Sequence, residues 1–170
     1  SSLKVTSMFC KQFFGTRVVS LIFFLGSAAM AFSQSSIHTI DEPITFRDGY
    51  ETMVKIWIPT DPINHPSEGW PAMLVIHGHG GSRNQGSEFH EVYAERGYIV
   101  VSYDVRGQGD AISRFTDNPL NNPCNAIHGG ASKAGASAKM DMAEVLHFAK
   151  FTLGKAMDFS RLGVRGKAQG

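Results

Sequence analysis

The sequence is short of cysteine, of net charge and of any apolar run long enough to span a membrane. Its 170 residues include two cysteines, and 16 Lys and Arg nearly balance 15 Asp and Glu, which gives a formal net charge of +1. The basic residues are scattered, so we expect no surface for nucleic acid. Hydrophobic residues make up 42% and charged residues 18%, the composition of one globular domain with a hydrophobic core.

The two cysteines predict neither a disulfide nor a metal site. Cys10 lies in a segment that we assign below to export, which leaves Cys124 alone in the mature chain. An intrachain disulfide within the mature chain is therefore excluded. Neither cysteine has a metal-type neighbour at close spacing. We expect no metal and no cofactor.

The N-terminal segment has the order of a secretory signal peptide. Lys11 and Arg17 supply a positive start, a short apolar run follows over 18–25, and Ala29-Met30-Ala31 is an A-x-A cleavage site. Cleavage after Ser33 fits as well. These features favour removal of the segment during export.

A membrane anchor is the alternative interpretation of this segment. A spanning helix needs about 20 apolar residues, whereas the stretch 18–32 is shorter and is interrupted by serine and glycine. We therefore predict a signal peptide over 1–33, with 1–7 as flank upstream of Met8, and a mature domain over 34–170. The expected product is secreted or periplasmic, without stable membrane association after cleavage.

The mature segment alternates strand and helix patterns. The expected elements are a β-hairpin of 43–47 and 50–58 around Asp48-Gly49, strands at 72–76, 98–103 and 161–165, and helices at 88–96 and 136–153. This order predicts an α/β fold with a largely parallel sheet and an opening hairpin. The long stretch 104–135 is expected to be a functional surface loop or a lid.

Two periodic patterns support these elements. In the hairpin, alternate residues fall on two faces: Val54, Ile56 and Ile58 on one, and Met53, Lys55 and Trp57 on the other. In the second helix, apolar residues recur on one face: Met142, Val145, Leu146, Ala149 and Leu153. Gly97 and Gly154 are expected to end the two helices.

The first motif is a glycine-rich loop directly after the buried strand at 72–76. It reads His77-Gly78-His79-Gly80-Gly81. Backbone N–H groups that stabilise an oxyanion must approach the reacting carbonyl closely, and glycines permit that approach. An H-G-x-G loop at this position is typical of the oxyanion loop of hydrolases. We assign the donor to the His79 N–H; a glycine-rich turn that binds nothing is the alternative.

The second motif follows the next strand and reads Tyr103-Asp104-Val105-Arg106-Gly107-Gln108-Gly109-Asp110. Because ligands bind at the carboxyl ends of parallel strands, this loop is expected to border the site. Asp104 and Arg106 could contact a ligand, or they could form an ion pair with each other that braces the loop. We favour the structural role for both residues.

The third motif reads Leu162-Gly163-Val164-Arg165-Gly166-Lys167-Ala168-Gln169-Gly170. Its last five residues fit the nucleophile elbow G-x-S-x-G, a sharp strand-to-helix turn, except that Ala168 stands where serine is expected. A methyl group cannot attack a carbonyl, so the chain as written lacks the nucleophile. A phosphate-binding loop is excluded, because it would need glycine at Arg161 and Ser or Thr at Ala168.

These motifs together resemble a known family. The segment from about Phe46 to Gly170 resembles serine α/β-hydrolases of the X-Pro dipeptidyl-peptidase and cocaine esterase-like group, on DGYETMVKIWIP, LVIHGHGG, YDVRGQGD and LGVRGKAQG. Acetyl xylan esterase and cephalosporin C deacetylase-like proteins are similar too, through Arg106-Gly107-Gln108 and through Gln169 after the nucleophile position.

The resemblance implies a serine hydrolase that cleaves ester or amide bonds through an acyl-enzyme, represented here by its N-terminal portion. Serine would stand at position 168, and the N–H groups of Gln169 and His79 would hold the oxyanion. The chain order serine, acid, histidine implies that the other two triad members lie beyond Gly170. With Ala168 and without them, this chain is expected to be inactive.

Other histidines and serines are expected to be structural. All seven histidines precede the elbow, so none is expected to be the triad base. His77 is expected to brace the 77–81 loop, and His128 and His147 to be loop and helix residues. Ser82 and Ser160, the latter expected in the loop before the last strand, lack the elbow context of a nucleophile.

Two alternatives stay open. Ala168 is consistent with a deliberate replacement, a sequence variant or a natural pseudoenzyme, and the last would be a catalytically dead binding protein. A carbohydrate deacetylase is the other alternative. The expected partners are a small-molecule ester, a peptide or an acylated sugar. A sheet that stops after the elbow strand exposes an edge, so poor solubility of the isolated fragment is expected.

Overall fold

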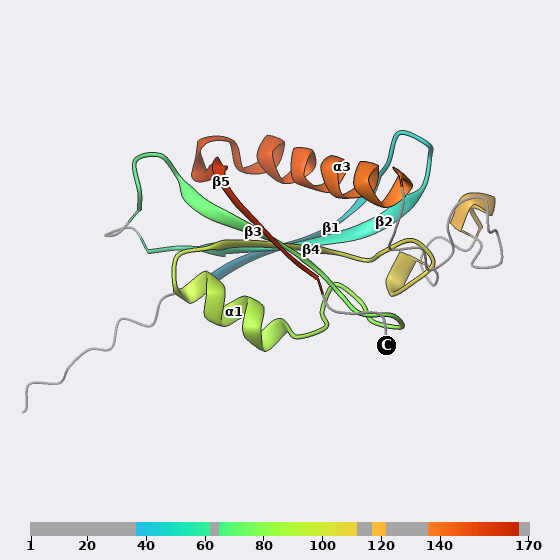
Figure 1. Ribbon diagram of the computed structural model, residues 1–170, viewed down its shortest axis with the longest axis horizontal. Coiled ribbons are helices and arrows are strands. Elements are labelled where there is room, and N and C mark those ends of the chain that lie inside the picture. Colours follow the sequence, from blue (N-terminus) through green and yellow to red (C-terminus); the bar gives the residue numbers. More distant parts are fainter. Residues whose placement is uncertain (1–36, 62–64, 112–116, 122–135, 167–170) are drawn as a thin grey trace, which may run out of the picture. The chain divides into compact units, whose positions relative to one another are not determined.

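The computed structural model describes residues 37–61, 65–111, 117–121 and 136–166, which form a five-stranded mixed sheet between two helices (Figure 1). The elements in chain order are β1 (Ile37–Thr45), β2 (Glu51–Pro59), β3 (Trp70–Ile76), α1 (Ser87–Glu95), β4 (Ile99–Tyr103), η1 (Pro119–Asn121), α3 (Ala136–Leu153), η3 (Gly154–Ala156) and β5 (Met157–Gly166). The predicted α/β class with an opening hairpin is confirmed.

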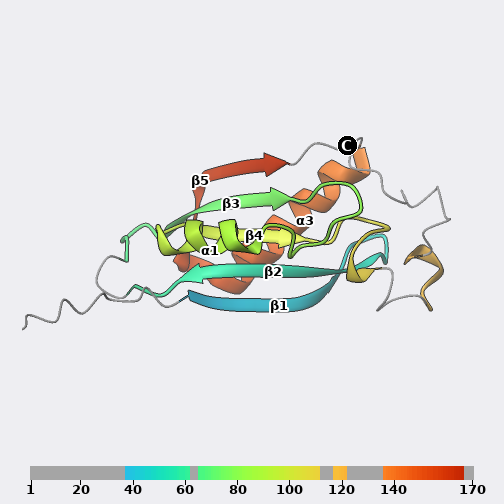
Figure 2. The same ribbon diagram turned by 90° about the horizontal axis from the view of Figure 1, so that it is seen from below.

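The sheet has the strand order β1-β2-β4-β3-β5 (Figure 2). β1 and β2 form an antiparallel hairpin, and β2 pairs with β4 in the antiparallel sense. β3 pairs in parallel with both β4 and β5. Each parallel connection passes through a helix, because parallel neighbours need a crossover.

The two faces of the sheet are covered by different helices (Figure 1). Val145, Leu146 and Ala149 of α3 join a core cluster with the side chains of one face, including Ile56 and Val101. On the other face, three residues form a separate buried cluster beside Tyr93 of α1: Trp57, Ala94 and Val100. This arrangement explains why β4 is buried along its whole length and shows no apolar–polar alternation, with Ser102 as its one polar aliphatic residue.

Most of the expected elements occur at or near the predicted positions. α3 has the predicted bounds, and its apolar stripe packs against the sheet. α1 begins and ends one residue before the predicted range, and Gly97 follows it at a φ of 85°. The hairpin turns at Gly49, whose φ is 85°, as the Asp-Gly pair predicted.

Three strands are longer than predicted: β3 begins two residues early at Trp70, and backbone pairing extends β1 and β5 further beyond their apolar residues. β1 begins at Ile37, six residues before the expected start at Pro43, and its polar outer residues pair with β2. β5 begins at Met157 rather than Arg161, and it pairs with β3 across an irregularity at Pro71/Ala72. Ser160 therefore lies within β5, and its placement in a preceding loop is wrong.

Several predictions concern residues outside the described ranges. They include the signal peptide over 1–33, both cysteines, His128, most of the expected 104–135 loop, and the positions Ala168 and Gln169. Within the ranges that the structure describes, no helix is long and apolar enough to cross a membrane.

Candidate active site

The first two sequence motifs and the strand part of the third, up to Gly166, lie at the carboxyl ends of neighbouring strands. β3, β4 and β5 are parallel, and their registers set Val75 beside Ser102 and Ile76 beside Gly166. The loops after β3 and β4 and the end of β5 therefore lie next to each other. Gly166, the first glycine of the elbow-like motif, lies beside Ile76, the residue before the 77–81 loop, although the two are 90 positions apart in sequence.

His77 joins the first two of these loops. Its side chain is buried, its Nδ1 lies 2.8 Å from the Gly78 carbonyl oxygen, and its Nε2 lies 3.0 Å from the Val105 nitrogen. A carbonyl oxygen can only accept and a backbone N–H can only donate. Nδ1 therefore carries the proton and Nε2 accepts, which defines the neutral Nδ1–H tautomer. The geometry fits the bracing role expected for His77.

The N–H groups of the 77–81 loop differ in their partners. The Gly78 N–H donates to Oε1 of Gln85 at 2.7 Å, the Gly80 N–H to Oε1 of Gln108 at 2.8 Å, and the Gly81 N–H to the Gly78 carbonyl at 3.1 Å. The His79 N–H has no hydrogen-bond acceptor among the described residues, and the His79 side chain is exposed. This loop thus presents one N–H group that is not used within the described fold.

Arg83 locks the 77–81 loop to the loop after β4. Its guanidinium contacts Asp104 and Asp110 at 2.7 Å each and Asp41 at 2.8 Å, and its backbone N–H donates to Asp104 at 2.6 Å. Burial alone would lower the pKa of Arg83, but the hydrogen bonds that its guanidinium donates to Asp41 and Asp110 raise the pKa above its ordinary value. The arginine is therefore a permanent cation that fixes the loop position.

Arg106 anchors the loop after β4 to α3. Its guanidinium forms two 2.7 Å hydrogen bonds with the buried Asp141 and a 2.7 Å contact with Asp48. It also lies 4.5 Å from the Tyr50 ring centroid, a cation–π geometry. The Tyr50 hydroxyl in turn accepts a 2.6 Å hydrogen bond from the Gly107 N–H.

The suggested ion pair between Asp104 and Arg106 is wrong, although both residues have the structural role that we favoured. Asp104 pairs with Arg83, and Arg106 pairs with Asp141 and Asp48. Sequence reasoning missed Arg83 and Asp141, because their partners lie 21 and 35 residues away. One sign of this network is visible in the sequence: Arg83 is an isolated arginine in the glycine-rich loop after β3.

Gly109 shows how closely this loop is packed. Its φ is +58°, and a Cβ at this position would collide with the Asp104 carboxylate. Gly80 in the facing loop has a φ of +70°, but a Cβ there would have no neighbour within 4 Å. The Asp104 carboxylate is thus packed directly against the backbone of Gly109, whereas Gly80 in the 77–81 loop has free space beside it.

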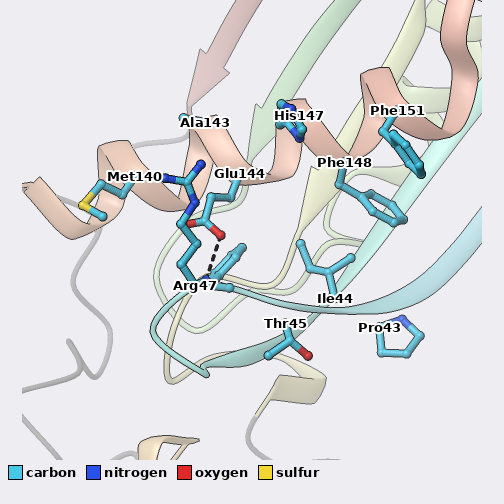
Figure 3. Close-up of a pocket in the computed structure, with 11 residues that line it drawn as sticks. Pro43, Ile44, Thr45, Arg47, Met140, Ala143, Glu144, His147, Phe148 and Phe151 are labelled. Atoms are coloured by element: carbon cyan, nitrogen blue, oxygen red, sulfur yellow. Dashed lines mark hydrogen bonds and ion pairs between the residues drawn. The ribbon is translucent and has the colours of Figure 1, made fainter.

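Two hollows lie in the described part of the structure, and one of them adjoins the motif loops. A groove of about 620 Å³ separates the end of β1 from α3, with the Phe148 and Phe151 rings and the Arg47–Glu144 pair on its walls (Figure 3). A second hollow of about 410 Å³ lies between α1 and the ends of β3 and β5, and His77, His90 and Gly166 line it. The second hollow is in direct contact with the motif-bearing loops.

No metal centre is evident in the described part of the chain. Within residues 37–61, 65–111, 117–121 and 136–166, no group of three or more His, Cys, Asp or Glu side chains is placed to hold a metal ion. The carboxylates near the strand ends instead neutralise Arg83 and Arg106. The described part of the site therefore offers backbone hydrogen-bond donors in a fixed loop and no set of metal-coordinating side chains.

Comparison with known proteins supports the resemblance that the motifs indicated. A family model described as X-Pro dipeptidyl-peptidase (S15 family) matches residues 48–117, which include the loops after β3 and β4. No curated protein sequence gives a significant match.

Solved structures show the same fold. The acetyl xylan esterase from Paenibacillus sp. R4 is similar with a TM-score of 0.55 and 21% identity, over 80% of this chain and 43% of that one. A 2,6-dihydroxy-pseudo-oxynicotine hydrolase gives a TM-score of 0.53 and 19% identity, over 76% and 30% of the two chains. Brefeldin A esterase, a bacterial homologue of human hormone sensitive lipase, gives 0.50 and 18%, over 81% and 33%.

The fold and these likenesses define the chain as an α/β-hydrolase-fold protein. Within that class, its residues 48–117 match the X-Pro dipeptidyl-peptidase (S15) family. The chain spans less than half the length of the three solved structures.

Proposed function

We propose that this chain is the N-terminal part of an exported serine hydrolase, in which the nucleophile position is occupied by Ala168. In a form with serine at this position, the hydroxyl oxygen would attack the acyl carbon of an ester or amide. A histidine beyond Gly170 would accept the hydroxyl proton, and an acyl-enzyme would form as the alcohol or amine leaves. Water would then release the acid.

The observation that carries this proposal is the pairing of Gly166 with Ile76. It starts the elbow-like motif directly beside the loop whose His79 N–H has no acceptor among the described residues. A nucleophile and an oxyanion donor must flank the same carbonyl group, so this adjacency is what acyl transfer requires. The His77 and Arg83 contacts support it, because they hold the donor loop before any substrate binds.

The Ala168→Ser variant of the full-length protein tests the proposal. Hydrolysis of short-chain p-nitrophenyl esters is measured for the alanine and the serine forms. We expect turnover only in the serine form, because the methyl group of alanine cannot act as a nucleophile. If neither form turns over while both are folded, the hydrolase proposal fails for these substrates.

A binding protein is the second candidate, and Ala168 itself favours it. Such a protein would keep the donor loop and would bind the carbonyl or carboxylate group of an ester, a peptide or an acylated sugar without cleaving it. Calorimetric titration of the alanine form with acetylated xylo-oligosaccharides separates the candidates. Binding without any turnover in the Ala168→Ser form would support the binding protein, whereas turnover of these sugars would support a carbohydrate deacetylase.

Export is proposed on the N-terminal sequence alone. A signal peptide over 1–33 would deliver the mature domain outside the cytoplasm. Expression in a bacterial host followed by N-terminal sequencing of the exported protein tests this. A mature start at Phe32 or Gln34 is expected, and retention of residues 18–32 in the membrane fraction would support an anchor instead.

A further inference from the structure

The smaller of the two hollows combines an apolar wall with a few polar groups. It measures about 410 Å³ and lies between the first turn of α1 and the ends of β3 and β5. Three side chains form the apolar wall: Val75, Ile76 and Phe89. The polar lining includes Glu88 and His90 of α1 and Arg165 of β5. A lining of this kind and size is typical of a site for a small molecule.

His90 is a buried polar side chain that the fold leaves unpaired. It is 3% exposed, and neither ring nitrogen has a hydrogen-bond partner among the described residues. Nδ1 is one of the fully buried, unpartnered atoms of the described structure, whereas Nε2 is not. Nε2 therefore reaches the accessible surface, and His90 lines the hollow. The ring thus presents an unused polar atom to this space.

The Nε2 atom carries the proton of this imidazole. Burial lowers the pKa of His90 to about 4, so the ring is neutral at neutral pH and only one nitrogen is protonated. A proton on Nδ1 would be a buried donor without an acceptor, which is costly. On Nε2 the N–H group can reach water or a ligand. His90 therefore offers the hollow a neutral hydrogen-bond donor.

Arg165 brings a positive charge to the β5 side of the hollow. Its Cζ lies 5.9 Å from the Phe89 ring centroid and 6.0 Å from that of Tyr93, and its guanidinium donates to the Tyr93 hydroxyl at 3.2 Å. No carboxylate of the described residues forms an ion pair with Arg165. Its charge adds to the lowering of the His90 pKa, so the two groups lie within range of each other.

The start of α1 adds a partial positive charge. The N-cap Gly86, and Glu88 and Phe89 of the first turn, line the hollow. No side chain caps the helix there, and the Glu88 N–H has no acceptor among the described residues. Free N–H groups at the start of a helix favour an anion. The exposed Glu88 carboxylate opposes this effect and limits the negative charge that the hollow can accept.

We propose that this hollow binds a small organic monocarboxylate, whose oxygens accept hydrogen bonds from Nε2 of His90 and from the Arg165 guanidinium. The apolar body of the ligand packs against the apolar wall. The nearby Glu88 disfavours a dianion such as phosphate, so a singly charged group is the better match. The site goes beyond the proposed hydrolysis, because it contains neither the nucleophile position nor the proposed oxyanion donors.

Calorimetric titration of the full-length protein with benzoate at pH 7 tests the site. Benzoate is the probe because it joins one carboxylate to an apolar ring. Arg165→Met is expected to raise the Kd about 10-fold, through the loss of a charge-assisted hydrogen bond. His90→Phe removes the donor, keeps an aromatic ring and should raise the Kd about fivefold. Glu88→Gln should lower the Kd about threefold, because it removes a repelling charge.

Arg96→Met is the matched control for Arg165→Met. Arg96 is exposed at the C-terminal end of α1 and does not line the hollow. Its replacement removes the same charge and should leave the Kd within about twofold of the parent. Equal losses of affinity for the two variants would assign the effect to net charge and overturn the inference. A folded protein that does not bind benzoate, or that binds inorganic phosphate more tightly, would overturn it as well.

A second measurement does not depend on the stability of a charge variant. Protein labelled with ¹⁵N-histidine is titrated with benzoate, and the His90 signals are assigned by their loss in His90→Phe. We expect a protonated Nε2 that shifts on binding. His147 lines the larger groove and should keep its signals in place. A shift at His147 without one at His90 would place the ligand in the larger groove and overturn the inference.

Both measurements use the form with Ala168 and involve no turnover. An Ala168→Ser form without esterase activity would therefore refute the hydrolase and leave the carboxylate site standing. Absence of benzoate binding in a protein that hydrolyses esters as the serine form would do the reverse.

Discussion

His90 shows at the residue scale how a polar side chain is held in the core of this domain. The residue is 3% exposed, and its ring makes an edge contact with Trp57 at a centroid distance of 4.5 Å. Burial lowers the pKa of His90 from 6.5 to about 4; nearby Glu88 opposes this shift, and Arg165 and Lys55 add to it. The imidazole is therefore neutral in the folded protein at neutral pH.

This lowered pKa makes stability depend on pH. Below pH 6.5 the unfolded chain binds a proton at His90 that the folded protein does not bind until about pH 4, so stability is full above 6.5 and is lost as the pH falls toward 4. We expect the free energy of unfolding to drop by about 2 kcal/mol from His90 between pH 7 and pH 5. Urea unfolding of the parent and of His90→Phe at pH 7 and pH 5 measures this drop in the free energy of unfolding.

The control for this experiment is His147→Phe, since His147 is exposed on α3. His90→Phe keeps an aromatic ring against Trp57 and should lose the pH-dependent difference, whereas His147→Phe should retain it. If the free energy of unfolding depends on pH in the same way for the parent and for His90→Phe, the lowered pKa of His90 is not the cause of that dependence.

At the scale of elements, α3 is tied to the sheet by more than its apolar stripe. Asp141 in its first half pairs with Arg106 of the loop after β4, and both side chains are about 95% buried. Glu144, one turn later, pairs with the exposed Arg47 at 3.9 Å. The helix thus carries one buried and one surface ion pair, whose energetic values should differ strongly.

Replacement of the two acids tests this difference. Asp141→Asn should destabilise the protein by about 3 kcal/mol, because it leaves the buried Arg106 with only the half-exposed Asp48 as a charged partner. Glu144→Gln should cost less than about 1 kcal/mol. Urea unfolding gives both values. The double variant Arg106→Met/Asp141→Leu should recover part of the loss, and a cost for Asp141→Asn no larger than that of Glu144→Gln would argue against the buried pair.

The elements also show where sequence patterns succeed and fail. The bounds of α3 were predictable because its apolar residues repeat with the helical period and Gly154 follows them. The first half of β1 was not, because His38, Asp41 and Glu42 give no alternation. Its backbone bonds to β2 make it a strand. The 77–81 loop was recognised from its glycines, but the hydrogen bonds that leave His79 free come from Gln85 and Gln108.

For the whole molecule, β5 is one of the two edge strands of the described sheet, and β1 is the other. β5 lies last in the strand order, and Val164 is 61% exposed on it. An edge strand with apolar side chains can pair with the same strand of another molecule. The expectation of poor solubility is consistent with this edge.

Val164→Lys tests the role of the edge in self-association of the chain. A charged residue on an edge strand opposes pairing, so this variant should stay monodisperse at higher concentrations than the parent in light-scattering measurements. Val92→Lys is the matched control, because Val92 is 39% exposed on α1, away from the edge. An equal gain in solubility from both substitutions would assign the effect to net charge rather than to the edge.

The sequence by itself determined the α/β class, the hairpin turn, both helices and the glycine-rich loops after β3 and β4. These features depend on local periodicity and on backbone conformations that glycine permits, so they can be read from neighbouring residues. The sequence also shows alanine, Ala168, where the elbow motif predicts a serine.

Only the tertiary structure decided which charges pair and which donors stay free. Asp104 forms an ion pair with Arg83, 21 residues away, and Arg106 forms one with Asp141, 35 residues away. Folding brings these side chains together in a space that excludes water. The same packing uses the N–H groups of Gly78 and Gly80, and leaves the His79 N–H and the Gln108 amide without acceptors in the described structure. Such choices depend on contacts between distant segments, and no local pattern in the chain encodes them.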